Sequence, residues 1–340
     1  MKKLKDTDFL CISSRIHSAD KDGVTPEKLL RLAEARDFDE ALSLTREMYG
    51  VQQDLQGMSS DYGKLLSDEL TKAYLFVSEL IGGMIDVDDK PYGLINPFRF
   101  VYDCQNLKMA IKCEALKKST EGLVSENGSV SKEKLIMAMN TRDFSAYPSN
   151  MAAAALLAIE ELARTDDPRE VDLILDKAAF CDMAEAAKGY DLDYLKELMK
   201  YKADSVNITT AIRCINQGKS RAYLDRLLVP GGVLDRDFFM SNYDETIGKL
   251  ISALAFTEYS DISKYSDAQS LLSASVAEKL CSMLYIKKAY SAERVPFGAE
   301  LVIYYIVKKE YEIKNVRIIL AGKACGMSAE KIRERLMIAV

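Results

Sequence analysis

A segment with helical character that recurs about every hundred residues constrains the fold of this 340-residue chain more than any other feature. Asp103–Cys113 and Asp204–Cys214 align over eleven positions without a gap, and Glu312–Gly322 is a third copy. In each copy an acid precedes an asparagine by three residues, and apolar residues follow the asparagine at positions one, four and five. Because self-similarity at a fixed period marks repeat architectures, we expect three similar units of about 100 residues.

A second motif recurs with the first. Val24–Leu29, Val130–Leu135 and Met327–Ile332 each place Ser or Thr after an apolar residue and end in Glu-Lys-Leu or Glu-Lys-Ile, and Val233–Phe238 is a degenerate version. The segment 8–19 takes the place of an asparagine-bearing helix but lacks the asparagine. We therefore predict domains at 1–129, which includes an N-terminal partial unit, at 130–232 and at 233–340.

The fold class is predicted to be all-α. Apolar residues recur at helical spacing in long stretches rich in Ala, Leu, Glu and Lys, and no long stretch alternates with a period of two. The stretches are Glu27–Leu44, Lys64–Ile81, Met151–Ala163, Val171–Ala187, Ala274–Ala289 and Ile303–Lys323. Helix starts are expected at Thr25-Pro26, Asp167-Pro168 and Ser328.

The acids and asparagines of the repeat are candidate bracing residues, that is, residues whose polar contacts hold neighbouring helices together. We include Arg317, which lies in the third copy, among these repeat positions. The pairs are Asp103 with Asn106, Asp204 with Asn207, and Glu312 with Asn315. Residues three apart share one helix face, and the apolar spacing puts each asparagine beside a buried stripe. We favour satisfied polar contacts that fix how consecutive helices meet over a ligand site repeated three times, because the third copy replaces Asp with Glu.

Charge and cysteine usage exclude several function classes. A net charge of −6 argues against nucleic acid or an anionic lipid surface as the main partner. No two of the seven cysteines form Cys-x-x-Cys and there is one histidine, so no structural zinc site and no cofactor is expected. Scattered thiols with apolar neighbours indicate core residues in a reducing compartment. No apolar run reaches the roughly 18 residues of a membrane span and the start lacks a secretory signal, so we expect a cytosolic protein.

No catalytic residue is expected. A nucleophilic triad would have to use His17, which lies in a short N-terminal helix. Gly218-Lys219-Ser220 resembles the end of a phosphate loop, but Arg213 stands where the leading glycine belongs. The acidic clusters Asp86-Val-Asp88-Asp89 and Asp166-Asp167 resemble a loop and a helix cap, and neither has a matching acidic helix for magnesium.

The C-terminal stretch Val295–Leu336 carries a family resemblance. Val295-Pro-Phe-Gly-Ala-Glu300, Tyr304 to Lys323 and Gly326 to Leu336 closely resemble the end of the C subunit of A/V-type ATP synthases, a relative of the d subunit of the vacuolar proton ATPase. The family's internal pattern also occurs at Asp103–Cys113, Asp204–Cys214 and Val171–Phe180, and more loosely at Phe9–Ile16.

The resemblance implies a funnel of three similar helical domains around a pseudo-threefold axis, with no catalytic site. It implies a central-stalk (rotor) subunit whose partners are the central axle and the membrane rotor ring, peripheral on the cytoplasmic face of the membrane. Such a subunit passes torque for proton or sodium transport. A helical-repeat scaffold or adaptor unrelated to ATPases is the alternative, and an all-α enzyme is a third interpretation.

Overall fold

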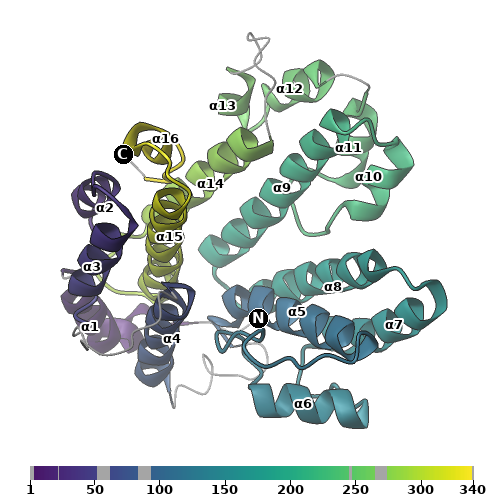
Figure 1. Cartoon of the computed structure of the whole chain (residues 1–340), viewed down its shortest axis with the longest axis horizontal. Helices are drawn as coiled ribbons and strands as arrows, with labels where there is room; N and C mark the ends of the chain where they lie inside the picture. The colour runs from purple at the N-terminus through teal and green to yellow at the C-terminus, as the bar shows by residue number, and fades with distance from the viewer. Residues whose placement is uncertain are drawn as a thin grey trace. The chain divides into compact units, whose positions relative to one another are not determined.

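The structure is a computed structural model that describes residues 4–21, 23–51, 62–82, 93–244, 247–264 and 274–338. Every regular element in these ranges is a helix, so the predicted all-α fold class is confirmed (Figure 1). No helix of the described ranges is long and apolar enough to cross a membrane. The chain divides into two compact units: a central unit, Met1–Leu4 with Gly83–Tyr285, and a terminal unit, Lys5–Gly82 with Ile286–Val340.

The central unit holds α5 (Asn96–Ala115), α6 (Lys132–Thr141), α7 (Ser149–Thr165), α8 (Pro168–Lys188), α9 (Asp193–Asn216), α10 (Arg221–Leu227), α11 (Arg236–Asn242), α12 (Gly248–Leu254), α13 (Ser260–Ser263) and the first part of α14 (Ala274–Tyr290). Helices α5 and α7 pack against α8, and α9 packs against α8 and α10 (Figure 1). The face that α7 buries is mostly alanine, at Ala154, Ala155 and Ala158, so its backbone can approach α8 closely.

The terminal unit joins the two ends of the sequence. It holds η1 (Asp6–Phe9), α1 (Leu10–Lys21), α2 (Pro26–Ala33), α3 (Phe38–Met48), α4 (Tyr62–Ile81), the last residues of α14, α15 (Ala299–Ala324) and α16 (Ala329–Arg333). Helix α15 is its centre, because α1, α2, α3, α4 and α16 all pack against it (Figure 1). Every residue of the apolar run Leu301–Val307 is accordingly buried, as expected for a helix surrounded by others.

The predicted domain boundaries do not coincide with this division. Residues 5–82 pack with the C-terminal helices rather than with the first repeat, because α15 needs α1 to α4 to cover its apolar surface. The cut between the units falls inside α14, at Tyr285, instead of at 129/130 or 232/233. The division into three similar domains and their pseudo-threefold arrangement stay a prediction.

The local helix starts follow the sequence closely, with one exception. Helix α8 begins at Pro168 with the Asp167 side chain accepting the N–H of Arg169, and Thr25 and Ser328 cap α2 and α16. The stretch predicted as helical at Glu27–Leu44 is not one helix, because Asp37 interrupts it. The Asp37 carboxylate accepts the N–H of Glu40 at 2.9 Å and starts a new helix, α3.

The cysteines divide between core and surface. Cys104, Cys113, Cys214 and Cys281 are buried, as expected, and Cys181 is half-buried. Cys11 and Cys325 are exposed, so the expectation that all thiols are core residues is wrong for these two. Both stand beside helix ends, where a residue can be flanked by apolar neighbours in sequence without being covered by them in space.

The three asparagine-bearing helices, α5, α9 and α15, end in the same way. Eleven residues after each asparagine, the backbone is left-handed, with φ of 52° at Lys117, 61° at Gly218 and 67° at Gly326. The residue that follows donates its N–H to the carbonyl five residues back: Lys118 to Cys113, Lys219 to Cys214 and Met327 to Gly322, at 2.8–2.9 Å. This is the Schellman arrangement, which satisfies carbonyls at the end of a helix. Gly218-Lys219-Ser220 is therefore a helix stop, followed by the N-cap of α10 at Ser220.

Lys117 is the one non-glycine residue of these three left-handed positions. A side chain there costs about 1–2 kcal/mol relative to glycine, so we expect Lys117→Gly to raise the free energy of unfolding by up to about 1 kcal/mol, after the extra freedom of glycine in the unfolded chain is subtracted. Gly218→Ala and Gly326→Ala should lower it by a similar amount. Urea unfolding of the three variants tests this, and equal stabilities would contradict it.

Candidate functional site

Each repeat asparagine binds the backbone N–H and carbonyl of one residue in the loop after its own helix. The side-chain Nδ2 donates to a backbone carbonyl, and Oδ1 accepts the N–H of the same residue, with all six bonds at 2.8–2.9 Å. The pairs are Asn106 with Ser125, Asn207 with Val229, and Asn315 with Met337. Each asparagine is at most 3% exposed. We call this two-bond pair an asparagine clamp; it satisfies a buried amide and ties the returning loop to the helix.

The acid three residues earlier caps the next turn of the same loop. Asp103 accepts the N–H of Ser129 at 3.0 Å, its hydroxyl at 2.6 Å, and the N–H of Val130 at 3.1 Å. These donors directly precede Ser131, the N-cap of α6, so the buried carboxylate holds the loop that leads into that helix. Gly128 lies so close that a Cβ on it would stand 2.4 Å from Asp103 Oδ1, which explains the glycine.

Asp204 repeats this arrangement before α11. It accepts the N–H of Val233 at 3.1 Å and of Leu234 at 3.0 Å, and a Cβ on Gly232 would stand 2.0 Å from its Oδ1. The Tyr259 hydroxyl adds a third donor at 2.9 Å. The predicted boundaries at 129/130 and 232/233 therefore fall within the very loops that these two acids cap.

Glu312 uses its carboxylate differently. Its Oε2 accepts from Lys309 at 2.9 Å, and its Oε1 is buried without a hydrogen-bond partner among the described residues. Oε1 lies 3.4 Å from where a Cβ on Gly23 would stand, one residue before Val24. The third acid thus faces the loop before α2, in the N-terminal part of the sequence.

The structure corrects the assignment of Met327–Ile332 as a copy of the motif at Val130–Leu135. Met327–Ile332 does start a helix, α16, but Ser328 follows Asn315 by thirteen residues, as Ser220 follows Asn207 at the start of α10. Helix α16 is therefore the counterpart of α10 and not of α6 or α11. The motif that lies next to the third acid is Val24–Leu29, which directly follows Gly23.

Arg317 takes no part in the clamp. It is exposed on α15, two residues beyond Asn315. In the first repeat the same position is Lys108, which is buried and pairs with Asp176 of α8 at 2.6 Å. One turn later Lys112 pairs with Asp172 at 2.6 Å. Sequence reasoning missed these pairs, although Lys at i, i+4 on one helix and Asp at i, i+4 on another is a readable signal.

A fourth buried acid, Asp182 of α8, binds the first turn of a helix directly. It accepts the N–H of Asn150 at 3.1 Å and of Met151 at 2.8 Å, together with the Asn150 side chain. These N–H groups belong to the first turn of α7, where an acid also faces the positive end of the helix dipole. It was not foreseen, because it belongs to no repeated motif.

Burial shifts the titration of these acids. Desolvation raises the pKa of Asp103, Asp204 and Glu312 above their ordinary values, while the hydrogen bonds and nearby cations described above oppose the shift. Burial and the charge of Asp204 raise the pKa of Tyr259, so its hydroxyl stays a donor. The geometry is suited to holding loops on helices.

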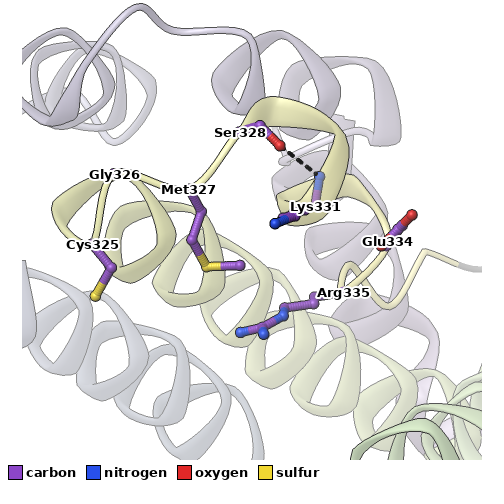
Figure 2. A pocket seen from close by; sticks show the side chains of 7 residues that line it. All are labelled: Cys325, Gly326, Met327, Ser328, Lys331, Glu334 and Arg335. Carbon is purple, nitrogen blue, oxygen red and sulfur yellow. Dashed lines mark hydrogen bonds between the residues drawn. The ribbon is translucent and has the colours of Figure 1, made fainter.

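The described surface also has a pocket of 680 Å³ where α15 turns into α16. Its lining residues are Cys325, Gly326, Met327, Ser328, Lys331, Glu334 and Arg335. The side chains of Met327, Lys331 and Arg335 converge on the space between the two helices (Figure 2). The Ser328 hydroxyl oxygen already accepts a hydrogen bond from the backbone N–H of Lys331. The pocket therefore offers two cations and a thioether to a ligand.

Groups suited to metal binding are not found together. Within the described ranges no three His, Cys, Asp or Glu side chains are placed to hold a metal ion. His17 is half-buried on α1. The cluster Asp86, Asp88 and Asp89 lies outside the described residues.

Comparisons with known proteins relate the sequence of this chain to one family. Residues 12–335 match the family model of the ATP synthase (C/AC39) subunit. The chain is 26% identical over 241 residues to the V-type ATP synthase C subunit of Thermus thermophilus, covering 69% of this chain and 71% of that protein. It is 24% identical over 285 residues to the V-type sodium ATPase C subunit of Enterococcus hirae, covering 82% and 83%. For the A-type ATP synthase C subunit of Methanocaldococcus jannaschii the identity is 22% over 339 residues, covering 91% and 84%.

The clamps can be tested with a control on the same helix. Asn315→Leu and Asn207→Leu each leave a buried N–H and carbonyl unpaired, so each should cost about 1–3 kcal/mol in the free energy of unfolding. Arg317→Ala changes an exposed residue and should stay within about 0.5 kcal/mol of wild type. Hydrogen exchange at the Met337 and Val229 amides should accelerate in the matching variant only. Unchanged exchange in both would contradict the clamp.

The pH dependence of Asp204 has a definite sign. Because its folded pKa is raised, its contribution to stability is complete below its ordinary pKa of 3.8 and declines as pH rises through the folded pKa. Asp204→Asn keeps the shape and does not titrate. The stability advantage of wild type over Asp204→Asn should therefore be largest near pH 4 and shrink toward pH 7. Urea titrations across this range measure it, with exposed Asp191→Asn as control; an advantage that grows with pH contradicts the assignment.

Proposed function

The chain belongs to the ATP synthase (C/AC39) subunit family, and from this premise we propose that it is a non-catalytic central-stalk subunit that couples the central axle to the membrane rotor ring of a rotary ATPase. The family match over nearly the whole chain is the observation that carries the proposal. The relatives are named as parts of V-type and A-type ATP synthases and of a V-type sodium ATPase, and the transported ion proposed here is a proton or sodium.

The internal bracing supports a mechanical role. A coupling subunit must not yield when one partner turns against the other, and close-packed helices resist deformation. The weak points of a helical repeat are its loops, which a load could straighten. Here α5, α9 and α15 each hold their returning loop through an asparagine clamp, and two of these loops are held again by Asp103 and Asp204.

The residues that could have suggested an active site have structural roles instead. Gly218 ends α9 and Ser220 begins α10, which accounts for the likeness to a phosphate loop. Asp167 caps α8. This supports a non-catalytic subunit that acts through its partners, positioned on the cytoplasmic face of the membrane by the complex.

Removal of the chain should separate ATP hydrolysis from ion transport. Without the link the head can turn over ATP while the ring stays still, so ion uptake per ATP in reconstituted vesicles should fall toward zero. Adding back the folded chain should restore it, and adding the chain unfolded by heat should not. Uptake per ATP that is unchanged in its absence would contradict coupling and favour the scaffold alternative.

A further inference from the structure

The C-terminal end of this acidic chain is locally basic. The chain carries a net charge of −6, but its residues from 317 to 338 include five cations and two acids. The cations are Arg317, Lys323, Lys331, Arg333 and Arg335, and the acids are Glu330 and Glu334. A basic surface on an acidic protein attracts the anionic groups of a partner to one defined place.

Two of these cations line the pocket without an acidic partner among the described residues. Lys323 donates to the Ala35 carbonyl, and Arg333 pairs with Glu34 at 2.7 Å. Lys331 and Arg335 are exposed, and neither forms an ion pair in the part of the chain that the structure describes. Both lie between α15 and α16 and point toward Met327 (Figure 2).

The repeat itself does not require these cations. Counted from the asparagine, the positions of Lys331 and Arg335 correspond to Tyr223 and Leu227 in the second repeat. The clamp and the Schellman turn are the same in both repeats, so the turn forms without the two charges. Lys331 and Arg335 are therefore not part of the repeat pattern, since the second copy has uncharged residues at both positions.

The wall that carries Lys331 and Arg335 is closely packed. A Cβ on Gly322 would stand 2.7 Å from Ile332 Cγ1, so α15 and α16 are in close contact. The pair of Arg333 with Glu34 ties α16 to the end of α2. A preformed wall binds a ligand without the cost of ordering it first.

We propose that this pocket binds an acidic segment of a partner protein, with carboxylates at Lys331 and Arg335 and an apolar side chain against Met327. The proposal rests on the proposed function, since the partner is another subunit of the complex. A compact phosphate is a poorer match, because the backbone N–H groups of Cys325, Gly326 and Met327 already donate within the helix end. A flat anionic bilayer is disfavoured by the recessed site and by Glu334 on its wall.

Charge reversal tests the proposal in the assembled protein. Lys331→Glu/Arg335→Glu should bind the complex stripped of this chain at least about tenfold more weakly than wild type, with a smaller salt dependence. Lys118→Glu/Lys134→Glu, which carries the same charge change on exposed residues of the central unit, should bind like wild type. Equal melting temperatures of the free chains show that the variants fold.

Cys325 supplies a second readout inside the pocket. Its alkylation by iodoacetamide should slow several-fold when wild type joins the complex, and should be unaffected by inorganic phosphate or by phosphatidylserine vesicles. The alkylation rate of exposed Cys11 in the free chain should be equal in wild type and variant.

Each result supports or overturns the proposal. Equal binding of wild type and Lys331→Glu/Arg335→Glu overturns it while leaving the coupling role intact. Slowing of Cys325 alkylation by phosphate or by vesicles also overturns it and assigns the pocket to that anion. If wild type itself does not bind the stripped complex, the proposed function fails and the docking site fails with it.

Discussion

A buried side-chain amide needs partners for both its donor and its acceptor, and the asparagine clamp supplies them from the backbone of a single residue about twenty positions downstream. The rest of the repeat depends on that pairing. Because Asn207 holds Val229, the loop returns to α9 and brings the N–H groups of Val233 and Leu234 onto Asp204, just before Asp235 caps α11. Loss of the clamp would leave unsatisfied polar groups in the core, which costs more than the bond itself contributes.

In the third copy the asparagine clamp is kept, but the acid faces a different part of the chain. Asn315 still clamps its own loop at Met337, but Glu312 faces Gly23 in the N-terminal part of the sequence. The N-terminal helices α1 to α4 therefore supply the packing around α15. This packing suits the coupling role that we propose, because helices from both parts of the sequence contact α15.

Much of this could be read from the sequence, since helical periodicity, caps and the acid-x-x-Asn motif are local signals. The all-α class, the start of α8 at Pro168 and the recurrence of Asn106, Asn207 and Asn315 in a repeated motif follow from such signals. The clamp partners could not be foreseen, because the asparagines bind a backbone N–H and carbonyl, which every loop residue except proline offers whatever its side chain. The contact between Tyr259 and Asp204 could not be foreseen either, because it spans 55 residues. Which helices cover α15 is likewise a matter of long-range packing, which periodicity does not specify.

If the chain links the axle to the ring, as we propose, it must turn with the axle. Single-molecule rotation of the membrane-anchored complex tests this most directly, with a gold particle fixed to an exposed residue of this chain during ATP hydrolysis. We predict stepwise rotation of the particle in the same sense and at the same rate as a particle on the axle. A particle that stays still while the axle turns would contradict the account.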